Sequence, residues 1–193
     1  MRILTAALHC FEEHGYAGTT LRMIAKAAGM SAESVQLSGP KRQLLIDAFT
    51  LATTGDDQHR ETPLLDLPGP KTKFAASSGQ DALIALMTWI ADSNLRIWRI
   101  WRALEQAAEH DVEVRNEFDA LLVRMRSESL RAVSSLSKRG LRSQTPLREL
   151  ADHLWLLALP DQYHRLCEQS GWSHAKYRRW LCSASSELLF PNA

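Results

Sequence analysis

The 193-residue sequence has few cysteines, and its charges almost cancel. The three cysteines, Cys10, Cys167 and Cys182, are odd in number and not in C-x-x-C spacing, which disfavours a disulfide framework and favours a reducing compartment. A formal net charge of +1 excludes a polycationic nucleic-acid coat and an acidic tail. No apolar run approaches the roughly 18 residues of a membrane span, and no signal-like region precedes the first amphipathic pattern. We therefore expect a cytoplasmic protein without a membrane partner.

Motifs of the common enzyme classes are also missing. The seven histidines form no H-E-x-x-H pair, and His164 with Cys167, three residues apart, has no third metal ligand nearby. The segment "SGPKRQ", residues 38–43, lacks the second glycine and the Ser or Thr of a phosphate loop. A nucleophile elbow and a dinucleotide fingerprint are absent as well. The sequence therefore predicts no catalytic site, no metal site and no cofactor.

Apolar residues recur with helical spacing along almost the whole chain, and no stretch alternates convincingly like a strand. This pattern predicts an all-α protein of about nine helices. Four short helices are expected in residues 1–53, and a linker or long loop in 54–78, which holds three of the seven prolines. A larger helical bundle is expected in 79–193, with helices at 80–93, 95–109, 111–138, 146–159 and 173–189.

The most informative local pattern lies between residues 19 and 36. Thr19 or Thr20 is placed to cap one short helix, which ends at Ala28-Gly29, and Ser31 is placed to cap the next. A small residue and a glycine let two helices cross closely, as in a helix-turn-helix. Side chains at the start of the second helix can then reach base edges and phosphates. An ordinary helical hairpin is the alternative explanation of this pattern.

Two segments resemble one family. The first, "ILTAALHCFEEHGYAGTTLRMIAKAAGMS" (residues 3–31), resembles the start of the TetR family of bacterial transcriptional regulators. The second, "LWLLALPDQYHRLCEQSGWSHAKYRRWL" (residues 154–181), resembles the last two helices of a TetR subgroup. The residues that carry the first match are Ala6, Ala7, Phe11, Gly15, Tyr16, Thr19, Thr20, Ile24, Ala25, Ala28, Gly29 and Ser31, with Lys41, Leu44 and Leu45 after them.

This resemblance implies a two-domain homodimer that acts as a repressor. Its N-terminal helix-turn-helix would bind double-stranded operator DNA, and its C-terminal bundle would bind a small-molecule effector that releases the protein from DNA. The DNA-contacting residues that the resemblance and the helix geometry predict are Thr20, Arg22, Ser31, Ala32, Glu33, Ser34, Gln36 and Lys41.

The recognition segment itself departs from the family pattern. Gln36 stands where the family has a tyrosine that reaches the phosphate backbone, and the segment is one residue shorter before Lys41. Residues 1–53 hold five basic and four acidic residues, a low charge for a DNA-binding domain. A second hypothesis therefore stays open: a helical dimer that binds small molecules or a protein, with a degenerate helix-turn-helix that does not bind DNA.

The bundle offers two further sets of candidate residues. An apolar or aromatic effector is expected to bind near the tryptophan-rich helices, although plain core packing is the alternative. The dimer is expected to form through the last helices, although an intramolecular core would give the same stripe. The pocket residues predicted are Trp89, Trp98, Trp101, Phe118, Leu121, Met125 and Trp155, and the interface residues predicted are Leu154, Tyr177, Trp180, Leu181, Ala184 and Leu188.

Overall fold

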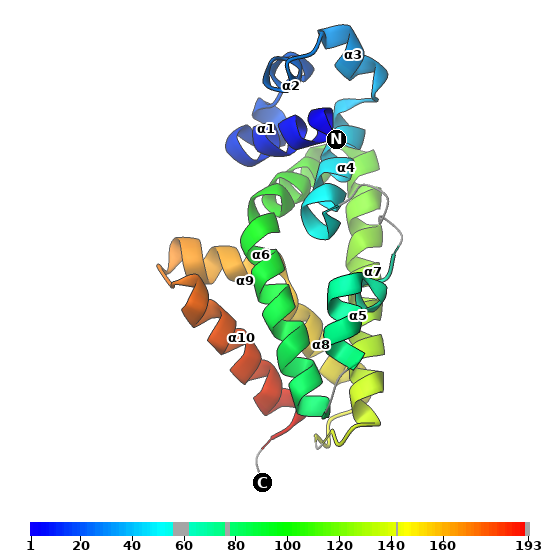
Figure 1. Ribbon diagram of the computed structural model, residues 1–193, viewed down its shortest axis with the longest axis vertical. Coiled ribbons are helices and arrows are strands. Elements are labelled where there is room, and N and C mark those ends of the chain that lie inside the picture. Colours follow the sequence, from blue (N-terminus) through cyan, green and yellow to red (C-terminus); the bar gives the residue numbers. More distant parts are fainter. Residues whose placement is uncertain (56–61, 76–77, 142, 192–193) are drawn as a thin grey trace. The chain divides into compact units, whose positions relative to one another are not determined.

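The computed structural model describes residues 1–55, 62–75, 78–141 and 143–191. Within these ranges the chain is helical and forms no strand, which confirms the predicted all-α class (Figure 1). Its α-helices are α1 (Arg2–Gly18), α2 (Leu21–Ala28), α3 (Ala32–Leu37), α4 (Lys41–Thr54), α5 (Pro68–Ala75), α6 (Gly79–His110), α7 (Val112–Ser137), α8 (Leu147–Ala158), α9 (Pro160–Tyr163) and α10 (His174–Leu189). No helix in the described ranges is long and apolar enough to cross a membrane.

The chain divides into two compact units. Unit 1 comprises Met1–Glu61 and Arg96–Leu121, and unit 2 comprises Thr62–Leu95 and Leu122–Ala193. The boundary after Leu95 falls inside the long helix α6, and the boundary after Leu121 falls inside the long helix α7. The compact unit that holds the first four helices therefore extends beyond the predicted boundary at residue 53, because the end of α6 and the start of α7 pack with it.

The core of unit 1 gathers apolar side chains from α1, α2 and α4. Phe11, Ile24 and Leu45 are almost completely buried there. α1 is kinked at Gly15, whose φ of 65° lies in the left-handed region that favours glycine. Beyond the kink, the buried Thr19 hydroxyl donates hydrogen bonds to the carbonyl oxygens of Cys10 (2.9 Å) and Gly15 (2.7 Å). These contacts hold Thr19, the residue that follows α1, against the body of that helix just before α2 begins.

Helix α6 runs without a break through the position where the sequence predicted one. The predicted helices 80–93 and 95–109 are a single 32-residue helix, so that prediction was wrong. Asn94 is buried, and its amide donates to the carbonyl oxygen of Ala158 and to the hydroxyl of Tyr177, each at 3.0 Å. Because these partners come from α8 and α10, the side chain does not compete for its own backbone, and the helix continues.

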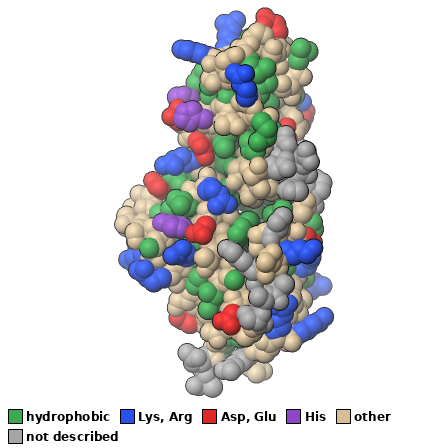
Figure 2. Space-filling model, in the orientation of Figure 1, with side chains coloured by type: hydrophobic (Ala, Val, Ile, Leu, Met, Phe, Trp, Pro, Cys, Tyr) green, Lys and Arg blue, Asp and Glu red, His purple; other side chains and the backbone are tan. Residues whose placement is uncertain are grey.

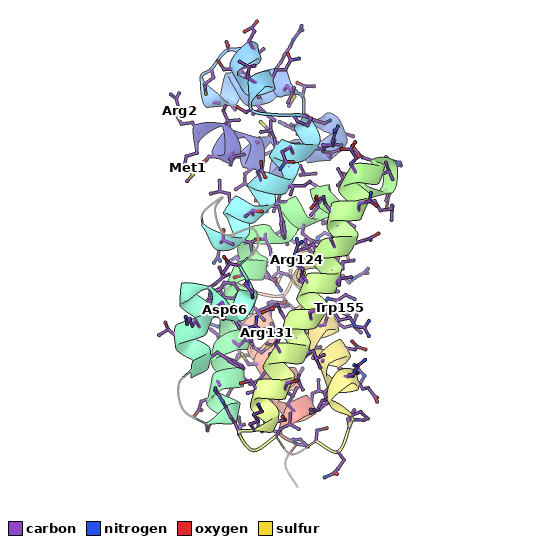
Figure 3. All side chains as sticks on the ribbon, turned by 90° about the vertical axis from the view of Figure 1, so that its right-hand side faces the viewer. Met1, Arg2, Asp66, Arg124, Arg131 and Trp155 are labelled. Atoms are coloured by element: carbon purple, nitrogen blue, oxygen red, sulfur yellow. The ribbon has the colours of Figure 1, made fainter. Side chains whose placement is uncertain are left out.

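The segment expected to be a linker, 54–78, contains ordered structure. A 3₁₀ turn, η2 (Leu64–Asp66), and α5 lie within it, whereas residues 56–61 and 76–77 of that prediction lie outside the described ranges. Arg131 of α7 pairs with Asp66 of η2 (3.1 Å) and with Glu128 (2.8 Å), and Asp66 and Arg131 are labelled in Figure 3. Glu128 also accepts a hydrogen bond from the backbone N–H of Leu65 (3.3 Å). The turn is thus attached to α7.

The last helices follow the predicted order with one addition. α7, α8 and α10 agree with the predicted helices 111–138, 146–159 and 173–189 to within one residue at each end. Between α8 and α10 the chain forms the short α9 and a π-helix, η3 (His164–Gln169). The side chain of Tyr177 is buried, and the centre of its ring lies 4.9 Å from the centre of the Tyr163 ring. Burial raises the pKa of Tyr177 to about 12. Tyr177 therefore stays neutral and packs α10 against α9.

Candidate nucleic-acid interface

The sequence around the α2–α3 corner contains the residues that such a corner needs. The Thr20 hydroxyl accepts a hydrogen bond from the Met23 N–H (3.2 Å) and caps α2. Gly29 ends α2 with a φ of 63°, and the next N–H, of Met30, donates to the carbonyl oxygen of Ala25 (3.0 Å). This is a Schellman-type ending, which reverses the chain in few residues. The predicted glycine corner is confirmed.

α3 begins directly after this corner. The Ser31 hydroxyl accepts from the Ser34 N–H (3.2 Å), and the two serine hydroxyl oxygens lie 3.0 Å apart. Hydrogen bonds from its own backbone N–H and from the Ser31 hydroxyl lower the pKa of the Glu33 carboxyl. Glu33 is therefore a carboxylate at neutral pH, at the helix end where the backbone N–H groups favour negative charge.

The short α3 uses only one of its side chains to anchor itself. Val35 is completely buried, whereas Ala32, Glu33 and Gln36 are exposed and Ser34 is partly exposed. Leu37, the last residue of α3, is 88% exposed, and no sequence pattern marked it as a candidate. The outer face of α3 is therefore left free of the chain's own packing, and it carries a carboxylate, an amide and one apolar side chain.

Lys41 makes contacts within unit 1 that the sequence did not predict. Its ammonium nitrogen donates to the carbonyl oxygens of Tyr16 (2.9 Å) and Thr19 (3.1 Å), and it lies 4.1 Å from the centre of the Tyr16 ring. Burial lowers the pKa of this lysine. These contacts attach the first residue of α4 to the end of α1, where free carbonyls attract a cation. Lys41 therefore has a structural role within unit 1, and its predicted contact with phosphate stays a prediction.

The other basic residues of helices α1 to α4 fall into two groups. Arg42 forms an ion pair with Glu113 of α7, and Arg2 donates to the carbonyl oxygen of Ala28 (2.8 Å), which caps the end of α2. Arg22 and Lys26 are exposed, four residues apart on α2, and make no ion pair with any described residue. On the face drawn in Figure 2, the blue side chains of the α1–α3 region stand apart and form no continuous basic surface.

The end of α6 and the start of α7 join this site through Asp111. One of its carboxylate oxygens accepts from the N–H groups of Glu113 (3.0 Å) and Val114 (3.2 Å) and so caps α7. The other accepts from the Tyr16 hydroxyl (3.3 Å). Burial, followed by the charge of Asp111, raises the pKa of Tyr16, so its hydroxyl remains a donor. Asp111 therefore connects the corner between α6 and α7 to α1 inside unit 1.

The predicted effector residues do not all lie in one unit. Trp101 is buried, with its ring centre 6.0 Å from that of Phe49 and 5.0 Å from that of Phe118, so aromatic packing accounts for it. In unit 2, the indole N–H of Trp155 (labelled in Figure 3) is buried and has no hydrogen-bond acceptor among the described residues. Unit 1 contains Trp98, Trp101, Phe118 and Leu121, and unit 2 contains Trp89, Met125 and Trp155. An effector pocket on these residues stays a prediction.

A cavity is present elsewhere in unit 1. Its volume is about 460 Å³, and it opens to solvent beside the start of α1 and both ends of α3. None of the predicted effector residues lines it. Its lining residues are Met1, Arg2, Ile3, Leu4, Met30, Ser38, Leu44 and Asp47.

The predicted dimer interface on α10 needs a correction. Tyr177 and Leu181 are completely buried within the chain, and Leu154 of α8 is 2% exposed, so none of these three side chains is accessible to a second copy. Tyr177 and Leu181 belong to the buried face of α10, together with Ser185 and Leu189, whereas Leu154 belongs to the buried face of α8. The remaining predicted residues, Trp180, Ala184 and Leu188, are partly exposed.

Comparison with known proteins agrees with this architecture. Residues 3–35 match the model of the family described as bacterial regulatory proteins, tetR family. Among curated proteins, no sequence matches the chain.

Solved structures share the fold over nearly the whole chain. FadR from Bacillus subtilis is a transcriptional regulator solved in complex with stearoyl-CoA. Its structure matches with a TM-score of 0.74 at 13% identity, and the match covers 100% of this chain and 99% of the FadR chain. PfmR from Thermus thermophilus, a TetR-family transcriptional regulator, has a TM-score of 0.71 at 18% identity, with coverage of 98% and 97%. A Saccharomonospora viridis protein in complex with choline has a TM-score of 0.70 at 18% identity, with coverage of 94% and 92%. The N-terminal segment of the chain thus matches the tetR family model, and the fold of the chain is similar to that of solved TetR-family regulators.

Proposed function

We propose that the chain is a ligand-responsive transcriptional repressor that binds operator DNA as a homodimer in the bacterial cytoplasm. The observation that carries this proposal is the outer face of α3. The corner at Gly29 and the cap at Ser31 hold that helix in place, while Val35 alone anchors it, so Glu33 and Gln36 remain exposed. An exposed helix that follows such a corner fits the major groove, where amide and carboxylate groups read base edges.

Contacts with phosphate fall to α2 in this proposal. Arg22 and Lys26 are exposed and unpaired with any described acidic residue, whereas Lys41 and Arg42 are engaged within unit 1. Few phosphate contacts mean weak non-specific binding, because neutralised phosphates supply most of that affinity. Specificity for the operator therefore depends strongly on α3.

The dimer would form through the partly exposed side chains of α10. Trp180, Ala184 and Leu188 recur every four residues and so lie along one side of that helix. A second copy related by twofold symmetry would meet the same stripe. Two α3 helices would then lie about 34–36 Å apart, one turn of DNA.

Effector binding would act on the DNA-binding unit through α6. This helix belongs to unit 2 up to Leu95 and to unit 1 from Arg96. Near its end, Trp101 packs on Phe49 of α4 and the Asp111 corner bonds to Tyr16 of α1. A shift of α6 that an effector favours would therefore change the helices that carry α3, which is how one binding site affects another.

The effector proposed is a small molecule with an apolar or aromatic body. Structural relatives were solved with stearoyl-CoA and with choline, so the shared fold accommodates different ligands. In this chain, the buried N–H of Trp155 offers one hydrogen-bond donor in unit 2. A ligand with an acceptor group would satisfy that donor, which otherwise stays buried at a cost in free energy.

The test is a selection of bound duplexes from a random DNA pool, followed by gel-shift titration of the purified full chain. The proposal predicts enrichment of a twofold-symmetric site, with shifts that DNA of scrambled sequence does not give. Gln36→Ala and Glu33→Ala should change which bases are enriched without loss of helicity. A chain that enriches no sequence, yet sediments as a dimer and binds small molecules, would support the degenerate helix-turn-helix instead.

A further inference from the structure

The exposed leucine at the end of α3 has no partner in the chain's own packing. Leu37 is 88% exposed, whereas the next exposed leucine in the described ranges, Leu156, is 47% exposed. Its neighbour two positions earlier, Val35, is completely buried and supplies the apolar anchor of α3. Leu37 is therefore not needed for the fold of unit 1.

Leu37 shares its side of α3 with two polar residues. Glu33, Gln36 and Leu37 occupy positions i, i+3 and i+4, which bring side chains together on one face of a helix. All three are exposed, and the anchor Val35 lies on another side. The face proposed to read DNA thus has one apolar group beside a carboxylate and an amide.

Only one apolar group is exposed among base edges in the major groove of ordinary DNA, the C5-methyl group of thymine. We propose that Leu37 selects the operator by contact with a thymine methyl group in each half-site. This inference rests on the proposed DNA-binding function. A protein partner fits the same face less well, because a single leucine next to an ionised Glu33 offers no continuous apolar patch.

The experiment replaces each thymine of the selected operator by deoxyuridine, which removes only the methyl group, at both symmetry-related positions. Binding of the full chain is measured by fluorescence anisotropy for the wild type and for Leu37→Ala. At one thymine position, replacement by deoxyuridine should weaken the binding of the wild type about three- to fivefold per half-site. This is the effect expected for the loss of one buried methyl group. The same replacement should leave the binding of Leu37→Ala unchanged.

Two further variants serve as controls. Leu37→Met keeps an apolar side chain of similar reach and should retain the preference for thymine over deoxyuridine. Met30→Ala removes another exposed apolar side chain near α3, 38% exposed, and should retain that preference as well. Circular dichroism should show equal helicity for all variants, because neither side chain is buried.

The outcomes separate the inference from the proposed function. If Leu37→Ala binds the thymine and deoxyuridine operators with the same ratio as the wild type at every position, the methyl contact is wrong and DNA binding stands. If the wild type prefers no sequence at all, both the inference and the proposed function fail. A thymine effect that disappears only in Leu37→Ala establishes the contact.

Discussion

The helices α3 and α10 differ in how many of their side chains are buried in the core and how many are exposed on the surface. α3 buries Val35 alone, and the rest of its surface is free. α10 buries Tyr177, Leu181 and two further residues at four-residue spacing, and the neighbouring stripe with Ala184 is partly exposed. The difference shows that α3 is held by its caps and its corner, whereas α10 is held by its own packing, so that only part of its apolar surface can meet a partner.

The largest effect is expected from a charge in the buried face of α10. Leu181→Asp places an unpaired carboxylate where the leucine is completely buried, and should lower the free energy of unfolding by more than about 4 kcal/mol. Chemical denaturation followed by circular dichroism measures this loss. A folded variant with unchanged helicity that sediments as a monomer would instead place Leu181 at the interface.

A charge in the partly exposed stripe should affect assembly and not folding. Ala184→Glu should raise the dimer dissociation constant at least about 100-fold, because two like charges would face each other across the twofold axis. Sedimentation velocity measures the change in mass. Ala175→Glu, a matched substitution at an exposed position on the opposite side of α10, should leave the dimer intact. Equal dimers for both variants would contradict the proposed interface.

Two lysines of unit 1, Lys41 and Lys26, also differ in their contacts within the chain. Lys41→Met should destabilise unit 1 by about 2 kcal/mol, the range for hydrogen bonds to a charged group, because the carbonyl groups of Tyr16 and Thr19 lose their partner. Thermal unfolding measures this change. The matched variant Lys26→Met, at an exposed position, should keep the wild-type unfolding temperature. If Lys41→Met unfolds like the wild type, the structural role of Lys41 is wrong.

The smallest effect concerns the salt dependence of DNA binding. Lys26→Met should reduce the slope of log K against log salt by about one unit, since one phosphate contact is lost. Lys41→Met should keep the wild-type slope, because its ammonium is engaged by carbonyl oxygens inside unit 1. Anisotropy titrations at several salt concentrations measure both slopes. The opposite assignment, with the slope lowered by Lys41→Met alone, would restore the phosphate role that the sequence predicted.

Local signals in the sequence were sufficient for the helix-turn-helix. Thr20, Gly29 and Ser31 act within three or four residues of their own positions, as caps and as a corner, so their roles follow from their residue types. The same holds for the first four helices, whose ends depend on glycine, threonine and proline nearby.

Roles that depend on distant partners could not be predicted in the same way. Asn94 keeps α6 continuous because its amide bonds to α8 and α10, and Lys41 bonds to carbonyl oxygens 22 and 25 residues earlier. On α10, the apolar stripe was recognised, but its side toward the core was assigned to a partner copy. Periodicity gives the direction of an apolar face and not the identity of what covers it.

The measurement that tests the account most directly is the ratio of affinities for the selected operator and for a scrambled duplex of the same length. The full chain should be titrated against both at about 0.15 M salt. The account predicts a ratio of at least about 10³, which falls when α3 is altered at Gln36 and Leu37 together. Equal affinity for the two duplexes would contradict the central claim that the outer face of α3 reads DNA.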